Sequence, residues 1–144
     1  MARALPLYTL VQLAAGVLGI FAVHLMFDLP IPDLSTKARA GIGQWTGELI
    51  ATLGLLLTVI GTSRHRPAWV PATVALYIAA AYWFTSSTSF ANPAITLARS
   101  LTDSFAGIRP ADAPGFIVAQ LAGALVGGWV GGWPFDRREI DEPQ

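Results

Sequence analysis

The chain has 144 residues, of which 53% are hydrophobic and only 12% are charged, whereas a typical soluble domain carries about 25% charged residues. Its formal net charge is zero and it contains no cysteine, which argues against a nucleic-acid-binding surface and excludes disulfide and thiol chemistry. The sequence holds no carboxylate pair, nucleophile set, phosphate-binding loop or metal-ligand spacing, so we expect neither an enzyme nor a bound cofactor.

Four apolar stretches are long enough to cross a bilayer, whose hydrocarbon core of roughly 30 Å needs about 20 helical residues. They are residues 5–27, 42–61, 68–84 and 113–133. The first is longer than the apolar region of a signal peptide, and Asp28-Leu29-Pro30 follows it in place of a small-residue cleavage site. We therefore predict a single all-helical membrane domain, with a charged and disordered tail at residues 136–144.

The distribution of cations predicts the orientation of the four spans. An even number of spans places both termini on the same side of the membrane. One side then holds Arg3, Arg64, Arg66, Arg137 and Arg138, and the other holds Lys37, Arg39 and Arg109. The excess on the first side predicts a multi-pass protein of the cell membrane with cytoplasmic termini.

Residues 85–105 lie between two spans and have a different pattern. Residues 85–91 are mostly polar, and seven extended residues reach about 20 Å, which is enough to descend to the membrane midplane. Asn92 suits an N-cap, and Pro93 suits the first helical position. A helix over residues 93–105 would be about 20 Å long and could return to the same face but not cross. Polar backbone at membrane depth is tolerated only inside protein or along a water-filled path, so we predict a re-entrant pore element. The alternative is an ordinary capped helix after an external loop.

Glu48 is a carboxylate inside the predicted second span, and Thr52 follows it by one helical turn. An isolated charge there costs about 2.5–3.5 kcal/mol even on the more lenient scale. Glu48 therefore needs polar partners at membrane depth. Two alternatives remain open, namely that the side chain extends to the interface near Trp45, or that it serves as a proton relay.

The first and last spans contain similar sequences. Residues 12–19 read Gln-Leu-Ala-Ala-Gly-Val-Leu-Gly, and residues 120–127 read Gln-Leu-Ala-Gly-Ala-Leu-Val-Gly. Small residues four apart allow helix backbones to approach closely, and here they are Ala15 and Gly19 in the first span and Gly123 and Gly127 in the last. These spans run in opposite directions, as in inverted-repeat channels, although any two helices rich in small residues would look alike.

Together, the Asn92-Pro93-Ala94 half-helix, the Glu48-x-x-x-Thr52 span and the Gln-Leu-Ala-x-Gly helix resemble the aquaporin, or major intrinsic protein, family. The resemblance covers residues 5–133. It implies a partial aquaporin-like bundle, in which the first span is similar to the family's third helix. The remainder is similar to the fourth, fifth and sixth helices with the second half-helix. The family's first two helices and its first Asn-Pro-Ala loop have no counterpart.

The resemblance assigns roles to individual residues. Asn92 would direct its amide toward the pore, and Glu48 would accept hydrogen bonds from the re-entrant loop, with Thr52 close by. Gln12 and Gln120 would bond across helices, and Arg99 would pair with Asp103 or with loop carbonyls, a filter role being the less favoured alternative. The backbone carbonyls expected to line the path belong to Ser86, Ser87, Thr88, Ser89, Phe90 and Ala91. His24 is expected to be an interface histidine rather than a gate.

The chain departs from the family at the outer filter, where many members have an arginine directly after this Asn-Pro-Ala. Here the position is Ile95, and the other filter positions on this half would be Ser89 and Ala80. Such a filter would be wider and less polar than one for water alone. It resembles bacterial subgroups that pass polyols such as glycerol or undissociated metalloid acids such as arsenite.

Three functional hypotheses follow. The first is a channel for water or small neutral solutes, completed by a partner chain or a second copy, since a pore of this kind needs two half-helices. By family resemblance it would be a homo-oligomer, specifically a tetramer. The second is a non-conducting, truncated relative. The third, a secondary transporter, is least favoured because Glu48 is the only strongly ionisable residue within the spans.

Overall fold

The computed structural model describes residues 5–132, and these residues form helices and connecting loops without a β-strand. The long helices are α1 (Leu5–Met26), α2 (Ile42–His65), α3 (Val70–Phe84) and α5 (Ala113–Gly132), and α4 (Pro93–Arg99) is the short one. Two short 3₁₀ turns, η2 (Pro67–Trp69) and η3 (Pro110–Asp112), precede α3 and α5. The predicted tail at residues 136–144 lies outside the described residues.

Four segments are long and apolar enough to cross a membrane, namely Pro6–Met26, Ile42–His65, Pro67–Phe84 and Pro110–Gly132. The prediction of an all-helical protein with four membrane-spanning segments is therefore confirmed. The second segment continues one turn beyond the predicted residue 61. It ends at His65 because Arg66 precedes Pro67, and a residue before proline is pushed out of the helical region.

The half-helix is shorter than predicted, since α4 ends at Arg99 and not near residue 105. Its last turn tightens, with the amides of Ser100 and Leu101 bonding to carbonyls three residues back. The next two carbonyls are taken by distant amides, because Ile108 N donates to Arg99 O at 3.3 Å and Ser35 N donates to Ser100 O at 3.0 Å. These tertiary hydrogen bonds satisfy the carbonyls that a longer helix would offer to the amides of residues 103 and 104.

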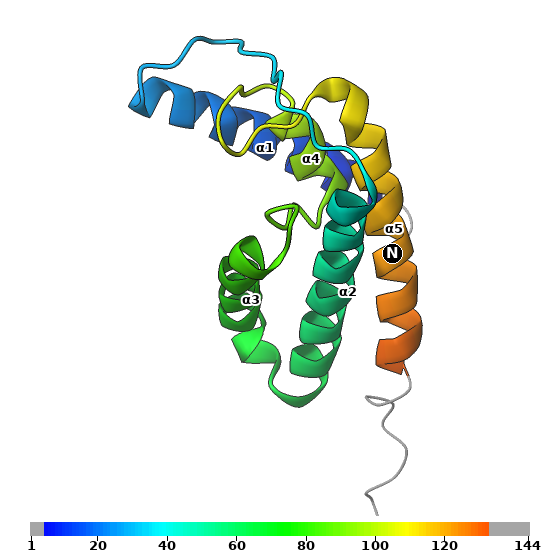
Figure 1. Ribbon diagram of the computed structural model, residues 1–144. Helices are drawn as coiled ribbons and strands as arrows, with labels where there is room; N and C mark the ends of the chain where they lie inside the picture. The colour runs from blue at the N-terminus through cyan, green and yellow to red at the C-terminus, as the bar shows by residue number, and fades with distance from the viewer. Residues whose placement is uncertain (1–4, 133–144) are drawn as a thin grey trace, which may run out of the picture.

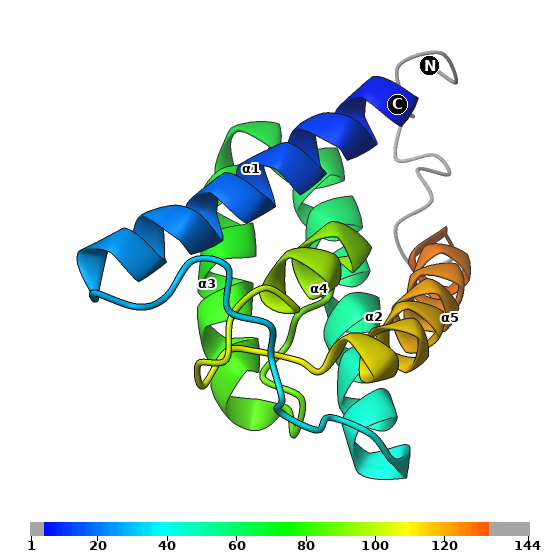
Figure 2. The same cartoon turned by 90° about the horizontal axis from the view of Figure 1, so that it is seen from above.

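Helices α2, α3 and α5 run along a similar direction, whereas α1 crosses them steeply at the end where α4 lies (Figures 1 and 2). The closest helix pair is α2 with α5. A Cβ atom added at Gly123 would collide with the Leu49 carbonyl oxygen, and one added at Gly127 would lie 3.0 Å from Leu53 O. This pair of glycines brings the two backbones together as small residues do in membrane helices.

The contact of α1 with α4 depends on a different residue than the sequence suggested. A Cβ atom at Gly16 would lie 3.0 Å from the Ala98 Cβ atom, whereas one at Gly19 would meet nothing within 4 Å. Gly16, and not the predicted pair of Ala15 and Gly19, therefore marks the close approach. Only 6% of the residues in the most apolar stretch of α1 are buried, and the same is true of the segment that contains α3. Both helices therefore expose most of their surface to lipid or to further protein.

Candidate functional site

The loop between α3 and α4 has an unusual backbone. Thr88, Ser89 and Ala91 all adopt left-handed conformations, with φ values of 62°, 46° and 50°. Residues other than glycine rarely adopt this region, and each instance costs on the order of 1–3 kcal/mol. The surrounding structure must therefore hold this loop in place.

Glu48 provides several of the contacts that hold this loop in place. Its side chain is fully buried at 0% exposure, and its two oxygens accept hydrogen bonds from the amides of Phe90 and Ala91, both at 2.8 Å. The Gln120 Nε2 atom of α5 donates to Glu48 Oε2 at 2.6 Å and to Thr96 Oγ1 of α4 at 2.8 Å. The carboxylate thus connects α2 to the loop and to α5, and Gln120 extends the network to α4. These bonds offset the cost of burying the charge.

Asn92 caps α4. Its backbone is extended (φ −155°, ψ 121°), and its Oδ1 atom accepts from Ala94 N at 2.8 Å and, more weakly, from Ile95 N at 3.5 Å. Pro93 occupies the first helical turn, as the sequence indicated. Because the cap uses the oxygen of the amide, its NH₂ group remains to donate hydrogen bonds to a solute.

The carbonyls predicted to line a path fall into two groups. Ser86 O accepts from Gln44 Nε2 at 2.8 Å, and Ser87 O accepts from Arg39 Nη1 at 3.0 Å. These two carbonyls are therefore engaged by protein donors. Among residues 5–132, no donor bonds to the carbonyls of residues 88–91, which are the acceptors that a solute could use.

Arg39 was missed as a site residue by the sequence reasoning, which counted it only as a loop cation. The residue is 5% exposed. Its guanidinium donates from Nε to Gly107 O at 2.7 Å, from Nη2 to Phe105 O at 2.8 Å and from Nη1 to Ser87 O at 3.0 Å. It also lies 5.2 Å from the centroid of the Phe90 ring. Arg39 therefore joins the loop before α2 to both loops that flank α4, and burial lowers its pKa.

Asp112 holds the backbone of the segment that carries Arg39. Its Oδ2 atom accepts from the Arg39 backbone amide at 2.8 Å, and its Oδ1 atom forms a 2.8 Å salt bridge with Arg109 Nη2. Both partners favour the charged carboxylate.

Arg99 does not pair with Asp103, so that prediction is wrong. Asp103 accepts hydrogen bonds from the backbone amide and the hydroxyl of Thr36. The hydrogen bond from the amide is the main reason that the pKa of Asp103 is lowered. The Arg99 guanidinium instead lies 4.3 Å from the centroid of the Phe90 ring, and its Nη1 atom has no hydrogen-bond partner among the described residues. Phe90 is thus contacted by two guanidinium groups, and it packs edge-to-face on Phe116 at 5.1 Å.

The proposed filter residues differ in exposure. Ala80 is exposed on α3, Ile95 is half-buried on α4, and Ser89 is buried at 3% with no hydrogen-bond partner for its hydroxyl among the described residues. In the described part of the chain, therefore, Ala80 lies on the surface, Ile95 is partly covered and Ser89 faces protein.

Two further predicted support residues stand apart from the Glu48 network. Gln12 is exposed on α1, unlike its counterpart Gln120, which is 1% exposed. Thr52 is buried, but its hydroxyl has no hydrogen-bond partner within residues 5–132.

His24 lies fully buried at the end of α1 and not at an interface with lipid. Its Nε2 atom is 2.8 Å from Thr102 Oγ1, and its Nδ1 atom contacts the Pro30 carbonyl. It therefore ties the loop after α1 to the segment after α4, in a structural position.

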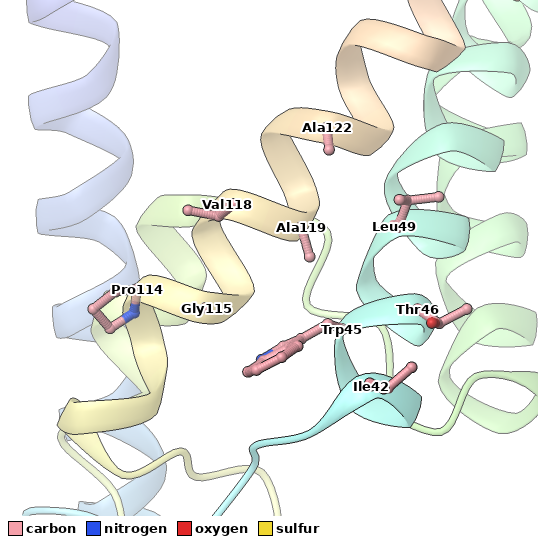
Figure 3. Close-up of a pocket in the computed structure, with 9 residues that line it drawn as sticks. All are labelled: Ile42, Trp45, Thr46, Leu49, Pro114, Gly115, Val118, Ala119 and Ala122. Carbon is pink, nitrogen blue, oxygen red and sulfur yellow. The ribbon is translucent and has the colours of Figure 1, made fainter.

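An apolar hollow of about 530 Å³ lies between the first turns of α2 and α5 (Figure 3). It is lined by Ile42, Trp45, Thr46, Leu49, Pro114, Gly115, Val118, Ala119 and Ala122. None of these residues belongs to the loop at residues 85–92, so this hollow is separate from Asn92 and from the bonds that hold the loop.

No family model matches the chain, and no solved structure matches it. One curated relative does: the chain is 52% identical over 118 residues to the aquaglyceroporin AqpS of Rhizobium meliloti (strain 1021). The match covers 82% of this chain and 51% of that protein, so the chain spans about half the length of its relative. This similarity also supports the prediction that the chain is not an enzyme. The chain is a partial relative of the aquaporin, or major intrinsic protein, family.

Proposed function

We propose that the chain forms part of an aquaporin-like channel for water or small neutral solutes. The observation that carries this proposal is the re-entrant loop, whose left-handed backbone is held by buried Glu48 and which leads directly into the Asn92-capped helix α4. A soluble or purely structural helix would not need a buried carboxylate to hold a strained polar loop between two apolar spans.

The chemistry of the site suits a neutral solute that carries oxygen. The Asn92 NH₂ group donates hydrogen bonds, and the unengaged carbonyls of residues 88–91 accept them. The half-helix adds partial positive charge at its N-terminus, and buried Arg39 and half-buried Arg99 lie around the neighbouring Phe90 ring. This concentration of positive charge disfavours cations on the path.

The pore requires a second half-helix, which we propose comes from further protein: a partner chain, or a second copy in the opposite orientation. The exposed surfaces of α1 and α3 support this requirement. Exposed Gln12 on α1 is available for such a partner. We further propose a tetrameric assembly in the cell membrane with cytoplasmic termini and a single domain over residues 1–144.

We propose Ile95 and Ala80 as filter residues, with Ser89 contributing through its backbone, because its side chain faces protein. Ile95 stands where many relatives have an arginine, so the filter is wider and less polar. Such a filter suits polyols and undissociated metalloid acids as well as water. The name of the relative, an aquaglyceroporin, is consistent with this range of solutes.

The test is reconstitution of the chain into liposomes, followed by stopped-flow shrinkage in gradients of sucrose and of glycerol. If two copies complete a pore, permeability should rise more steeply than linearly with protein density. Asn92→Asp is the matched variant, because it keeps the capping oxygen and removes the NH₂ donors, and it should reduce the flux. Permeability equal to that of empty liposomes at every density would refute a pore formed by this chain alone.

A non-conducting role is the second candidate, favoured by the presence of only one half-helix within residues 5–132. Under this alternative the helix packing is retained without transport. Coexpression with a segment that carries two spans and an Asn-Pro-Ala half-helix separates the two, because only the channel should gain flux.

A further inference from the structure

We propose that Arg99 is a positioning residue for the re-entrant loop. Its guanidinium holds the Phe90 ring by a cation–π contact and thereby helps to fix the carbonyls of residues 88–91, which no donor among the described residues engages. The contact itself is a property of the fold, and its value for solute passage rests on the channel proposed above.

Phe90 is the side chain that anchors the loop. Residues 85–91 contain only threonine, serine and alanine besides this one large side chain. The ring is 3% exposed, packs edge-to-face on Phe116 at 5.1 Å and shares an apolar cluster with Ile108. A shift of the ring would move the backbone on both sides of it, where Ser89 and Ala91 are left-handed.

The place of Arg99 on α4 explains how it reaches this ring. Arg99 follows Asn92 by about two helical turns, so both lie on the same side of the half-helix. Long side chains of a helix point back toward its N-terminus. The Arg99 guanidinium accordingly lies 4.3 Å from the centroid of Phe90, which precedes the helix. The contact thus joins the last residue of α4 to the loop before its first.

Arg99 depends on the ring more than Arg39 does. Arg39 also contacts the ring, at 5.2 Å, but three carbonyl groups fix its guanidinium. The Nη1 atom of Arg99 is buried without a hydrogen-bond partner, and no carboxylate within residues 5–132 forms a salt bridge with Arg99. An aromatic face attracts a guanidinium and can accept an N–H, and the attraction is stronger when the cation is desolvated. The Phe90 ring is therefore the group that compensates this cation.

The test replaces Phe90 in the full chain by phenylalanine analogues that carry one, two or three ring fluorines. Each fluorine withdraws electron density from the ring face and weakens a cation–π contact, while the size of the ring changes little. The readout is hydrogen–deuterium exchange at the amides of residues 90 and 91 in detergent micelles. We expect exchange to accelerate stepwise, by about fivefold in total, the factor for one cation–π contact. A ring that only fills space would not give this stepwise dependence.

Variants of Arg99 separate this guanidinium from that of Arg39. Arg99→Met keeps a long side chain without the charge, and it should remove most of the dependence on fluorine number. Arg99→Lys keeps a cation but not the planar guanidinium, so it should retain part of the dependence. An unchanged dependence in Arg99→Met would overturn the proposal.

The same fluorine series at Phe116 is the matched control, because Phe116 packs on the Phe90 ring and no cation–π contact reaches it in the described part of the chain. Exchange at residues 90 and 91 should then be nearly independent of fluorine number. A flat series at Phe90, or an equal series at Phe116, would refute the role of Arg99. Exchange is read without any flux, so a chain that shows the dependence but no permeability would support this inference and refute only the channel.

Discussion

Replacement of Glu48 by glutamine is the sharpest test of how the re-entrant loop is held. The carboxylate accepts from Phe90 N, Ala91 N and Gln120 Nε2. The variant side chain has one oxygen, so its NH₂ group must face at least one of these donors. Hydrogen bonds to a charged group contribute about 1.5–3 kcal/mol, and a buried orphan donor costs about 1–3 kcal/mol. Removal of the buried charge offsets part of this cost. We therefore expect the variant to lose about 2 kcal/mol of the free energy that holds the loop in place.

The assay is hydrogen–deuterium exchange in detergent micelles, read at the amides of Phe90 and Ala91. A loss of about 2 kcal/mol should accelerate exchange there about 30-fold, since 1.4 kcal/mol is a factor of ten. Thr52→Val is the matched control on the next turn of α2, because the Thr52 hydroxyl is buried without a partner among the described residues. Unchanged exchange in Glu48→Gln, or equal acceleration in both variants, would refute the reasoning.

Three further predictions concern the rest of the scaffold. Arg39→Met should lower the unfolding free energy by about 3 kcal/mol, because three carbonyls lose a charged donor, and Arg39→Lys should restore only part of it. The hydrogen bond from the Thr36 amide lowers the folded-state pKa of Asp103, so the stability from this carboxylate is present above about pH 4 and is lost as pH falls through the depressed value. Acid titration monitored by circular dichroism should show this loss, and Asp103→Asn should remove it. Gly123→Ala should lower the melting temperature, because its Cβ atom meets an α2 carbonyl, whereas Gly19→Ala should not. Equal melting of the two alanine variants would contradict the packing of α5 on α2.

The sequence alone determined the features that depend on local chemistry. The length of apolar stretches predicted the spans, because the bilayer thickness fixes the number of helical residues. Asn92 and Pro93 predicted the start of α4, because an N-cap and a first-turn proline act within a few residues. Glu48 stood out because a charge in a span requires partners, although the sequence could not name the amides of Phe90 and Ala91.

Only the tertiary structure decided the features that depend on groups distant in sequence. At the end of α4, the carbonyls of Arg99 and Ser100 accept from the distant amides of Ile108 and Ser35 and not from a further helical turn. Arg99 lies over the Phe90 ring, and Asp103 accepts from Thr36 in the loop before α2. The sequence indicates only that Arg39 is a cation in a loop. The fold places carbonyls from two other loops around it, and this makes it a site residue. Local patterns carry no information about such partners, because hydrogen bonds and ring contacts form wherever the packed helices bring donors and acceptors together.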